Sequence, residues 1–303
     1  MVKNLRIIVI IIILSITTIP VKAGLSFGIL PDDAAIPLIV ASETGLFQEK
    51  GLEIELLPFK TAIERDSALQ TGRIDGTIAD IVAAAFAIDN GKDLKITSMA
   101  DGRFTLLAAA DSDLLSYHDL KEVEIAISSN TIIEYLTDNF FSDQGIDNSN
   151  LNKIVISKIP VRLQLLIEGK EQAAVLPEPL ASLAQSKGAR VMGTSNELGG
   201  APVVMLFSEK AIQNKNDEIK IFYDVYSQVV ELVNKNHEKY RQLIVDKGGF
   251  PASIKNNFKF ISYQRPYLPE QKMVNEVLSW MKERNLLKTQ LEYTDLVSDE
   301  FIE

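Results

Sequence analysis

Residues 24–33 read Gly24-Leu25-Ser26-Phe27-Gly28-Ile29-Leu30-Pro31-Asp32-Asp33, and residues 44–52 read Thr44-Gly45-Leu46-Phe47-Gln48-Glu49-Lys50-Gly51-Leu52. The first segment has the pattern of an apolar strand followed by a polar loop, and the second has a helix end marked by glycine before the next strand. Strands and helices continue to alternate up to residue 110, and most of the helices stop at a glycine. This alternation predicts an open α/β sheet, in which ligands bind at the carboxyl ends of the strands.

The hydrophobic periodicity predicts elements along the whole chain. In a first block we expect strands at 25–30, 52–56, 74–79, 94–98 and 104–108, with helices at 35–49, 61–71 and 81–90. In a second block we expect strands at 124–127, 153–156, 173–176 and 190–192, with helices at 131–144, 161–168 and 180–187. An apolar strand at 203–207 returns the chain to the first block, and the pattern is purely helical from about residue 211.

These two blocks predict two lobes. We expect the first lobe to consist of residues 24–108 plus 205–303, and the second of residues 109–204. The chain then crosses between the lobes near Ala108 and near Val204. Two crossings form a hinge, so a ligand is expected between the lobes.

The first 23 residues have the pattern of a secretory signal peptide. Lys3 and Arg6 precede an apolar run at 7–16, and small residues stand at positions −3 and −1 before a cleavage site after Ala23. The run is shorter than the ~20 residues that a membrane span needs. We therefore expect secretion across the cytoplasmic membrane to the periplasm or the cell surface; an uncleaved anchor is the alternative.

The composition excludes several classes of function. The net charge is −10 and the isoelectric point is about 4.9, which argues against a nucleic-acid partner because phosphate binding needs a basic surface. The chain has no cysteine, so it has no disulfide, no thiolate nucleophile and no lipid-anchoring cysteine. We expect no cofactor, no lipoprotein anchor and a monomeric protein.

The chain resembles the substrate-binding proteins of nitrate, sulfonate and taurine ABC importers, a group that includes the thiamine-precursor binders. The resemblance covers residues 25–285 and is carried by the segments 41–52, 72–76, 101–104, 125–135 and 176–180 in this order. It implies the type II periplasmic-binding-protein fold, in which two α/β lobes close on a small ligand. It also implies docking of the closed form on an ABC permease, and it does not fix the ligand.

Two loops of the first lobe are candidate ligand sites. Pro31, Asp32 and Asp33 follow the first strand and precede a helix, where backbone N–H groups and the helix dipole favour ligand contact. Ala79 and Asp80 follow the third strand in the same way, and members of the resembled family often contact ligand at this loop. The alternative for either aspartate is simple capping of the helix that follows.

The segment Ser128-Ser129-Asn130-Thr131 is the strongest candidate in the second lobe. Its hydroxyl groups and backbone amides stand at a predicted helix N-terminus and offer several donors to one anionic or carbonyl group. Capping is again the alternative, although capping needs only one of the four residues.

Pro177 and Glu178 follow another strand of the second lobe, and the flanking prolines hold the glutamate in place. Arg103 and Arg162 are the arginines nearest the predicted cleft and can bind a carboxylate or sulfonate, or pair with a neighbouring acid. Asp32, Asp80 and Glu178 together would make the cleft acidic, which favours a neutral or cationic organic ligand over nitrate or sulfonate.

The function that these observations favour is a solute-binding protein of an ABC importer, with a small organic solute and an ABC permease as partners and no chemistry performed. An enzyme on the same fold is a second hypothesis, but the chain lacks Gly-x-Ser-x-Gly, His-Glu-x-x-His and Gly-x-x-x-x-Gly-Lys. A sensor that passes a ligand signal to a membrane partner is the third, and the sequence does not separate it from the first.

Overall fold

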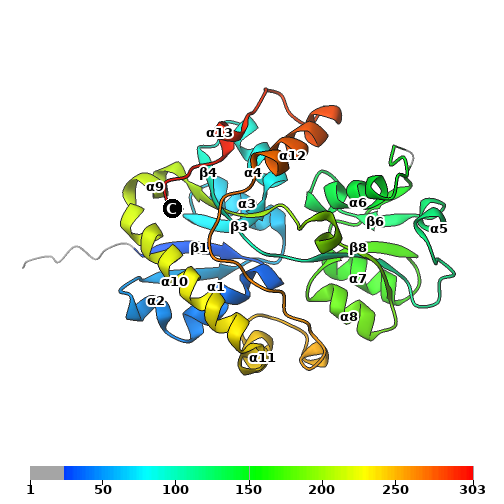
Figure 1. Ribbon diagram of the computed structural model, residues 1–303, viewed down its shortest axis with the longest axis horizontal. Coiled ribbons are helices and arrows are strands. Elements are labelled where there is room, and N and C mark those ends of the chain that lie inside the picture. The colour runs from blue at the N-terminus through cyan, green and yellow to red at the C-terminus, as the bar shows by residue number, and fades with distance from the viewer. Residues whose placement is uncertain (1–23, 150, 303) are drawn as a thin grey trace, which may run out of the picture.

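The computed structural model describes residues 24–149 and 151–302, so the signal peptide predicted over residues 1–23 lies outside the described part of the chain. The described residues form two lobes side by side, each built on one five-stranded mixed sheet with helices around it (Figure 1). This architecture confirms the two-lobed α/β fold that the alternation of strands and helices predicts.

The first sheet has the strand order β2-β1-β3-β10-β4. Its strands are β1 (Leu25–Ile29), β2 (Ile54–Pro58), β3 (Gly76–Asp80), β4 (Leu94–Met99) and β10 (Val203–Ser208). The neighbours β2, β1 and β3 are parallel, as helical crossovers require, whereas β10 lies antiparallel between β3 and β4. The late strand β10 therefore joins the sheet made by the start of the chain, as predicted.

The second sheet has the strand order β7-β6-β8-β5-β9. Its strands are β5 (Phe104–Ala108), β6 (Ile125–Ile127), β7 (Lys153–Val155), β8 (Ala173–Pro177) and β9 (Arg190–Thr194). The prediction that β5 belongs to the first lobe is wrong, because β5 pairs antiparallel with β8 and with β9. The first crossing thus lies at residues 100–103, one strand earlier than predicted, and the second lies at residues 199–202.

Helices cover both sheets. Those that follow strands of the first sheet are η1 (Asp33–Ala35), α1 (Ile36–Glu43), α2 (Leu46–Glu49), α3 (Ala62–Gln70) and α4 (Ile81–Asp89). Those of the second lobe are α5 (Tyr117–Lys121), α6 (Ile132–Asp143), α7 (Ile159–Ile167), α8 (Leu180–Ser186) and η2 (Ser195–Leu198). The single helix predicted over 35–49 is divided, because Gly45 adopts a left-handed conformation with φ of +79° between α1 and α2.

Beyond β10 the described residues form helices, as predicted, but an irregular segment at 255–270 separates η3 from α12. The helices are α9 (Glu209–Asn214), α10 (Asn216–Lys235), α11 (His237–Asp246), η3 (Ala252–Ile254), α12 (Gln271–Glu283) and α13 (Tyr293–Leu296). Helix α10 packs on the first lobe through Phe222, which contacts Phe27 of β1 and Phe207 of β10 with ring centroids 4.9 and 5.7 Å away. The predicted core stripe of Phe222, Tyr223 and Tyr226 is confirmed, since all three are buried.

The same C-terminal segment also contacts the second lobe. Helix α12 packs on α4 of the first lobe, and its Trp280 donates a hydrogen bond of 2.9 Å from Nε1 to Asp138 of α6. The Trp280 ring lies edge-on to the ring of Tyr135, and Arg284 forms an ion pair with Asp138. At the opposite side of the molecule η3 contacts α8 (Figure 1). The lobes are therefore joined by side-chain contacts as well as by the two crossings.

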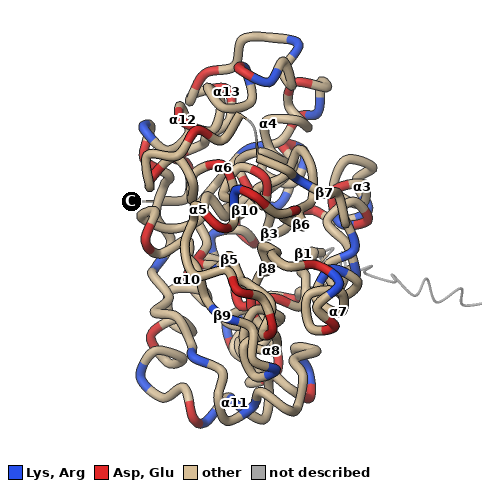
Figure 2. The backbone as a smooth tube through the Cα atoms, turned by 90° about the vertical axis from the view of Figure 1, so that its right-hand side faces the viewer, with Lys and Arg blue, Asp and Glu red and all other residues tan. Residues whose placement is uncertain are grey.

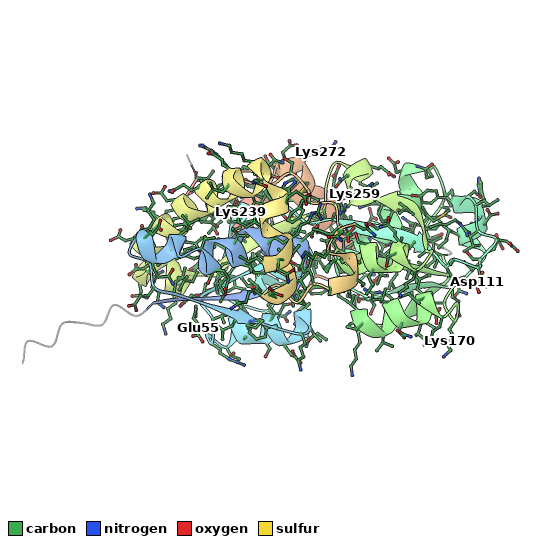
Figure 3. The ribbon with its side chains drawn as sticks, turned by 90° about the horizontal axis from the view of Figure 1, so that it is seen from below. Glu55, Asp111, Lys170, Lys239, Lys259 and Lys272 are labelled. Carbon is green, nitrogen blue, oxygen red and sulfur yellow. The ribbon has the colours of Figure 1, made fainter. Side chains whose placement is uncertain are left out.

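Acidic and basic residues are scattered over both lobes, and neither sign dominates one face (Figure 2). The sticks in Figure 3 show many of these side chains at the periphery of both lobes, among them Glu55, Asp111 and Lys170. A dispersed charge of this kind favours solubility over binding to a charged polymer.

Candidate functional site

The carboxyl ends of the parallel strands in both sheets point toward the crossings. In the first sheet Asp80, at the end of β3, pairs with Val203, the first residue of β10 after the second crossing. In the second sheet Pro177, at the end of β8, pairs with Phe104, the first residue of β5 after the first crossing. The loops that were predicted to bind ligand therefore face each other across the boundary between the lobes.

Arg103 joins the two lobes at the first crossing. Its guanidinium donates two hydrogen bonds to Oε1 of Glu178, 3.0 Å from Nη2 and 3.3 Å from Nε, and Nη2 also donates to the carbonyl oxygen of Lys259. Lys259 lies beside the boundary between the lobes (Figure 3). The other carboxylate oxygen of Glu178 accepts the backbone N–H of Ser182 at 2.9 Å. Glu178 is 1% exposed and held by these hydrogen bonds, so it is a buried residue with a fixed position.

Asp33 completes this network from the first lobe. Both of its carboxylate oxygens accept the backbone N–H of Arg103, at 3.2 and 3.3 Å, and Tyr263 donates its hydroxyl hydrogen to the Asp33 carbonyl oxygen at 2.8 Å. Burial and the nearby carboxylates of Asp32 and Glu178 raise the pKa of Asp33 well above its usual value, against the favourable effect of Arg103. Asp33 and Glu178 thus hold the first crossing in place, because both carboxylates bind Arg103. Within the described residues, the guanidinium of Arg103 is the one cation near these two acids.

Asp32 and Asp80 both cap helices at the carboxyl edge of the first sheet. Oδ1 of Asp32 accepts the N–H of Ala35 at 3.2 Å, and Oδ1 of Asp80 accepts the N–H of Ala83 at 2.9 Å. Removal of each carboxyl group from water raises its pKa to about 6, even though Arg65 and the backbone N–H groups act in the opposite direction. Both residues therefore cap helices, as the alternative predicted. Each carboxylate can still accept further hydrogen bonds, for example through its second oxygen.

Arg65, which the sequence reasoning missed, lies close enough to both carboxyl groups to lower their pKa values. It belongs to α3, is 4% exposed, and contacts Oδ1 of Asp66 with Nε at 2.8 Å and Nη2 at 2.7 Å. Its position carried a usable signal, because α3 follows the carboxyl end of β2 as the other candidate loops follow their strands.

In the second lobe Ser128 and Thr131 are engaged in the start of α6. Thr131 caps the helix by accepting the N–H of Ile133 at 3.2 Å and donates to the carbonyl oxygen of Ser128 at 2.7 Å. Ser128 is 8% exposed, and its hydroxyl accepts a hydrogen bond of 2.8 Å from Nη1 of Arg162. The structure thus brings Arg162, on α7, against the segment that the sequence marks as the strongest candidate.

The remaining candidates occupy different positions. Ser129 and Asn130 are exposed, and the backbone N–H of Asn130 donates to Glu134 at 2.7 Å. Ala79 and Pro177 are buried strand residues, which can present backbone but little side chain to a ligand, and Pro31 is exposed. The ligand-contact prediction for these five residues stays a prediction.

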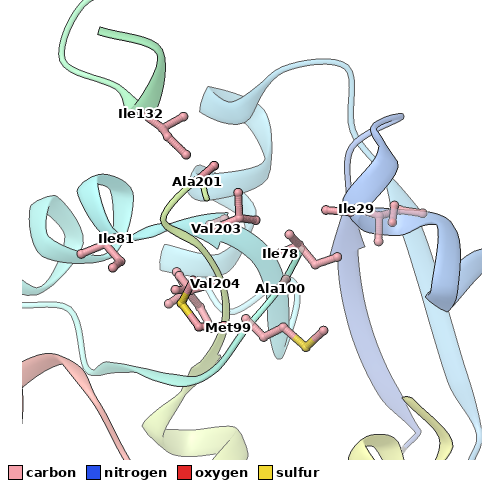
Figure 4. Close-up of a cluster of buried hydrophobic side chains, with 14 of the residues drawn as sticks. Ile29, Ile78, Ile81, Met99, Ala100, Ile132, Ala201, Val203 and Val204 are labelled. Atoms are coloured by element: carbon pink, nitrogen blue, oxygen red, sulfur yellow. The ribbon is translucent and has the colours of Figure 1, made fainter. Parts of the chain in front are cut away.

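A buried apolar cluster lies beneath the loops at the second crossing. Figure 4 shows Ile132, the first residue of α6, beside Ala201, with Ile81 of α4 and Val203 of β10 near by. All four residues are buried and belong to one hydrophobic cluster. The starts of α4 and α6 are therefore neighbours across the lobe boundary.

A separate groove of about 1140 Å³ lies between α6 and α12. It is lined by Tyr135, Asn139, Glu197, Glu276 and Trp280 among others, and by none of the predicted ligand residues. Within residues 24–149 and 151–302, no group of three or more His, Cys, Asp or Glu side chains is placed to hold a metal ion. Over the same ranges no helix combines the length and the apolarity needed to cross a bilayer.

Comparison with models of known families identifies the family of this chain. Residues 20–244 match the model of the NMT1-like family. The chain belongs to the NMT1-like family. No curated protein matches it.

Three of the solved structures of similar fold are binding proteins for small solutes. The alkanesulfonate-binding protein SsuA of Xanthomonas axonopodis pv. citri, bound to MOPS, has a TM-score of 0.78 and 19% identity over 91% of this chain and 98% of its own. The aliphatic sulphonate-binding protein SsuA of Escherichia coli has a TM-score of 0.76 and 17% identity, with coverage of 90% and 97%. The nitrate-binding protein NrtA of Synechocystis has a TM-score of 0.69 and 11% identity, with coverage of 88% and 83%. At these identities the likeness shows the fold of this NMT1-like protein.

Proposed function

We propose that this protein is an extracytoplasmic solute-binding protein that captures a small organic ligand between its lobes and delivers it to an ABC permease. The observation that carries the proposal is the orientation of the sheets. In both lobes the carboxyl ends of the parallel strands face the crossings, with Asp80 at one edge and Pro177 at the other. A ligand held there touches both lobes, so binding favours the closed arrangement over an open one.

Within the described residues, the proposed lobes are 24–99 plus 203–302, and 104–149 plus 151–198, with the crossings between them. The ligand-contact residues that we propose lie on the loops at 31–33, 79–80 and 128–131 and at Arg103, Pro177 and Glu178. We also propose export, with cleavage after Ala23, and a monomeric protein without a nucleic-acid partner. The negative net charge and the leader pattern support these points.

Nothing in the site favours an enzyme. The buried acids Asp33 and Glu178 are engaged with Arg103, and Asp32 and Asp80 cap helices. A proposed nucleophile would need a base within hydrogen-bond reach, and Nε2 of His237 is buried without a hydrogen-bond partner. We therefore propose binding without catalysis.

The test is a ligand screen of the protein exported by a bacterial host. Melting temperatures are measured against a library of organic acids, amines, amino acids, sulfonates, heterocycles and vitamin precursors. A solute at 100 times its dissociation constant is expected to add about 2.7 kcal/mol to the stability. Small-angle scattering of the protein with that solute should show a smaller radius of gyration, and mass spectrometry should recover the solute unchanged.

Two further measurements separate the alternatives. N-terminal sequencing of the exported protein reports whether residues 1–23 are removed. Uptake of the solute by vesicles carrying the permease and its ATPase should depend on added protein if delivery is its role, and should not if it is a sensor. A library without any binder, or a solute that is converted to a product, would overturn the proposal.

A further inference from the structure

We propose that the solute is amphoteric, with an anionic group that binds Arg162 and Ser128 of the second lobe and an amino or amidine group that faces Asp32 and Asp80 of the first. This inference rests on the proposed function, since it concerns the same cleft. It narrows the solute to one chemical class and replaces the neutral or cationic ligand that the acidic residues alone suggest.

The first argument is the state of Arg162. Its side chain is 0% exposed, and it donates from Nη1 to Ser128 Oγ at 2.8 Å and to the Ile156 carbonyl oxygen at 2.9 Å. Nε and Nη2 are buried without a hydrogen-bond partner, and within the described ranges no carboxylate forms an ion pair with this guanidinium. Burial lowers the pKa of Arg162 only to about 10, so it stays charged at neutral pH. A buried cation without a counter-charge is costly, and an anionic ligand supplies the missing partner.

The second argument is the position of this guanidinium. Ser128 follows β6, Ile156 follows β7, and α6 begins at Ile132, so Arg162 lies at the carboxyl edge of the sheet and beside a helix N-terminus. Helix α6 has 12 residues, long enough for its dipole and its first free N–H groups to favour an anion. The guanidinium is hydrogen-bonded to the hydroxyl of Ser128 beside the helix start, where Glu134 already accepts the N–H of Asn130.

The third argument is the charge of the opposite lobe. Ile132 lies beside Ala201 in Figure 4, and the carbonyl oxygen of Pro202 accepts the N–H of Ile81 at 3.0 Å, so the start of α6 lies near the start of α4. The residue that caps α4 is Asp80.

Asp80 and Asp32 share the influence of one cation, Arg65, which is itself paired with Asp66. With pKa values of about 6, Asp32 and Asp80 are mostly ionised at neutral pH, so this face of the first lobe carries more negative than positive charge. A ligand that carries only an anion would be repelled by these carboxylates, and one that carries only a cation would leave Arg162 uncompensated. An amphoteric ligand satisfies both faces.

The first arm of the test uses sulfate as a minimal anion. Melting temperatures of wild type, Arg162→Met and Arg265→Met are measured in potassium sulfate and in potassium chloride at equal ionic strength. Arg265 is an exposed arginine that pairs with Glu231, so Arg265→Met controls for the loss of a surface charge. Sulfate is expected to raise the melting temperature of wild type and of Arg265→Met more than that of Arg162→Met. Equal shifts in all three proteins would overturn the anion site.

The chloride measurement gives a second readout. If Arg162 is kept for ligand binding, Arg162→Met should melt at the same temperature as wild type or higher in chloride, because it removes an uncompensated buried charge. A clear fall in the melting temperature would assign Arg162 a structural role instead. Should Arg162→Met fail to fold, Arg162→Lys, which keeps the charge but loses the planar fork, is expected to show a reduced sulfate shift, and an undiminished shift would count against the site.

The second arm uses the solutes that the library screen identifies. Each binder is compared by calorimetry with its analogue lacking the amino group and with its analogue lacking the acid group. Both analogues are expected to bind at least tenfold more weakly. A binder without an anionic group, or without an amino or amidine group, would overturn this inference and leave the proposed function standing. A library without binders would count against the proposed function, while the sulfate arm still decides on Arg162.

Discussion

Asp80→Asn should make the protein more stable at neutral pH. The asparagine side chain can still accept the N–H of Ala83 and caps helices as well as aspartate, so the cap of α4 is kept. What is lost is a carboxyl group that is 8% exposed and whose pKa is raised from 3.8 to about 6 by burial. A rise of about two units corresponds to about 3 kcal/mol at 1.36 kcal/mol per unit.

The sign follows from proton linkage. The folded-state pKa of Asp80 lies above the unfolded value, so the folded state binds the proton more tightly. The stability that the carboxyl group contributes is complete below its unfolded pKa and is lost as the pH rises through about 6. Asparagine does not titrate. The variant should therefore exceed wild type by up to about 3 kcal/mol above pH ~7 and match it below pH ~4.

The assay is urea unfolding of both proteins at several pH values in this range, without added solute. Asp147→Asn is the control of opposite sign, because hydrogen bonds from Ser149 lower the pKa of Asp147 on an exposed loop. That control should be no more stable than wild type at neutral pH. An Asp80→Asn variant that equals wild type at pH ~7.5, or that gains the same amount at every pH, would refute the assignment of the raised pKa to burial.

Three further substitutions test other parts of the structure by urea unfolding at neutral pH. Arg103→Met leaves the buried Glu178 without its cation and should lower the free energy of unfolding by about 3–5 kcal/mol. Arg265→Met, at an exposed ion pair, should lower it by less than about 1 kcal/mol. Similar losses in the two variants would contradict the role given to burial. Trp280→Phe removes the indole N–H bond to a carboxylate of α6 and should cost about 1.5–3 kcal/mol, and no loss would mean that this contact between the lobes contributes nothing. Phe222→Ala opens a cavity in a fully buried aromatic cluster and should cost about 3–5 kcal/mol, so a loss near zero would contradict the packing.

The fold could be predicted because local periodicity records which residues are buried. The alternating strands of the first block and the helical stripe around Phe222 needed no information beyond their own segments. To assign β5 to a sheet, by contrast, information from outside its own segment was needed. Phe104 pairs with Pro177 and Ala108 with Ala173, and no local pattern in either strand encodes that choice. A strand next to a crossing can join either sheet with the same sequence of apolar residues.

The site could be predicted to the level of loops and not to the level of partners. Asp32, Asp80 and Ser128 were expected at the carboxyl edges of the sheets because they follow strands, and the structure places them at these edges. The bond between Arg103 and Glu178 joins residues 75 positions apart, so it depends on the packing of the two lobes. The inward direction of Arg162 likewise depends on the rotation of α7 against the sheet, which sequence spacing leaves open.

Trp280 is the only tryptophan of the chain, and it stands at the contact between α12 and α6 with Tyr135 on one side and Arg284 over its ring. Its ultraviolet emission therefore reports on this one place in the molecule. Separation of the helices would exchange a carboxylate, an aromatic edge and a guanidinium for water around the indole. The unmodified protein thus carries its own optical probe, with which stopped-flow mixing can time the movement of one half against the other.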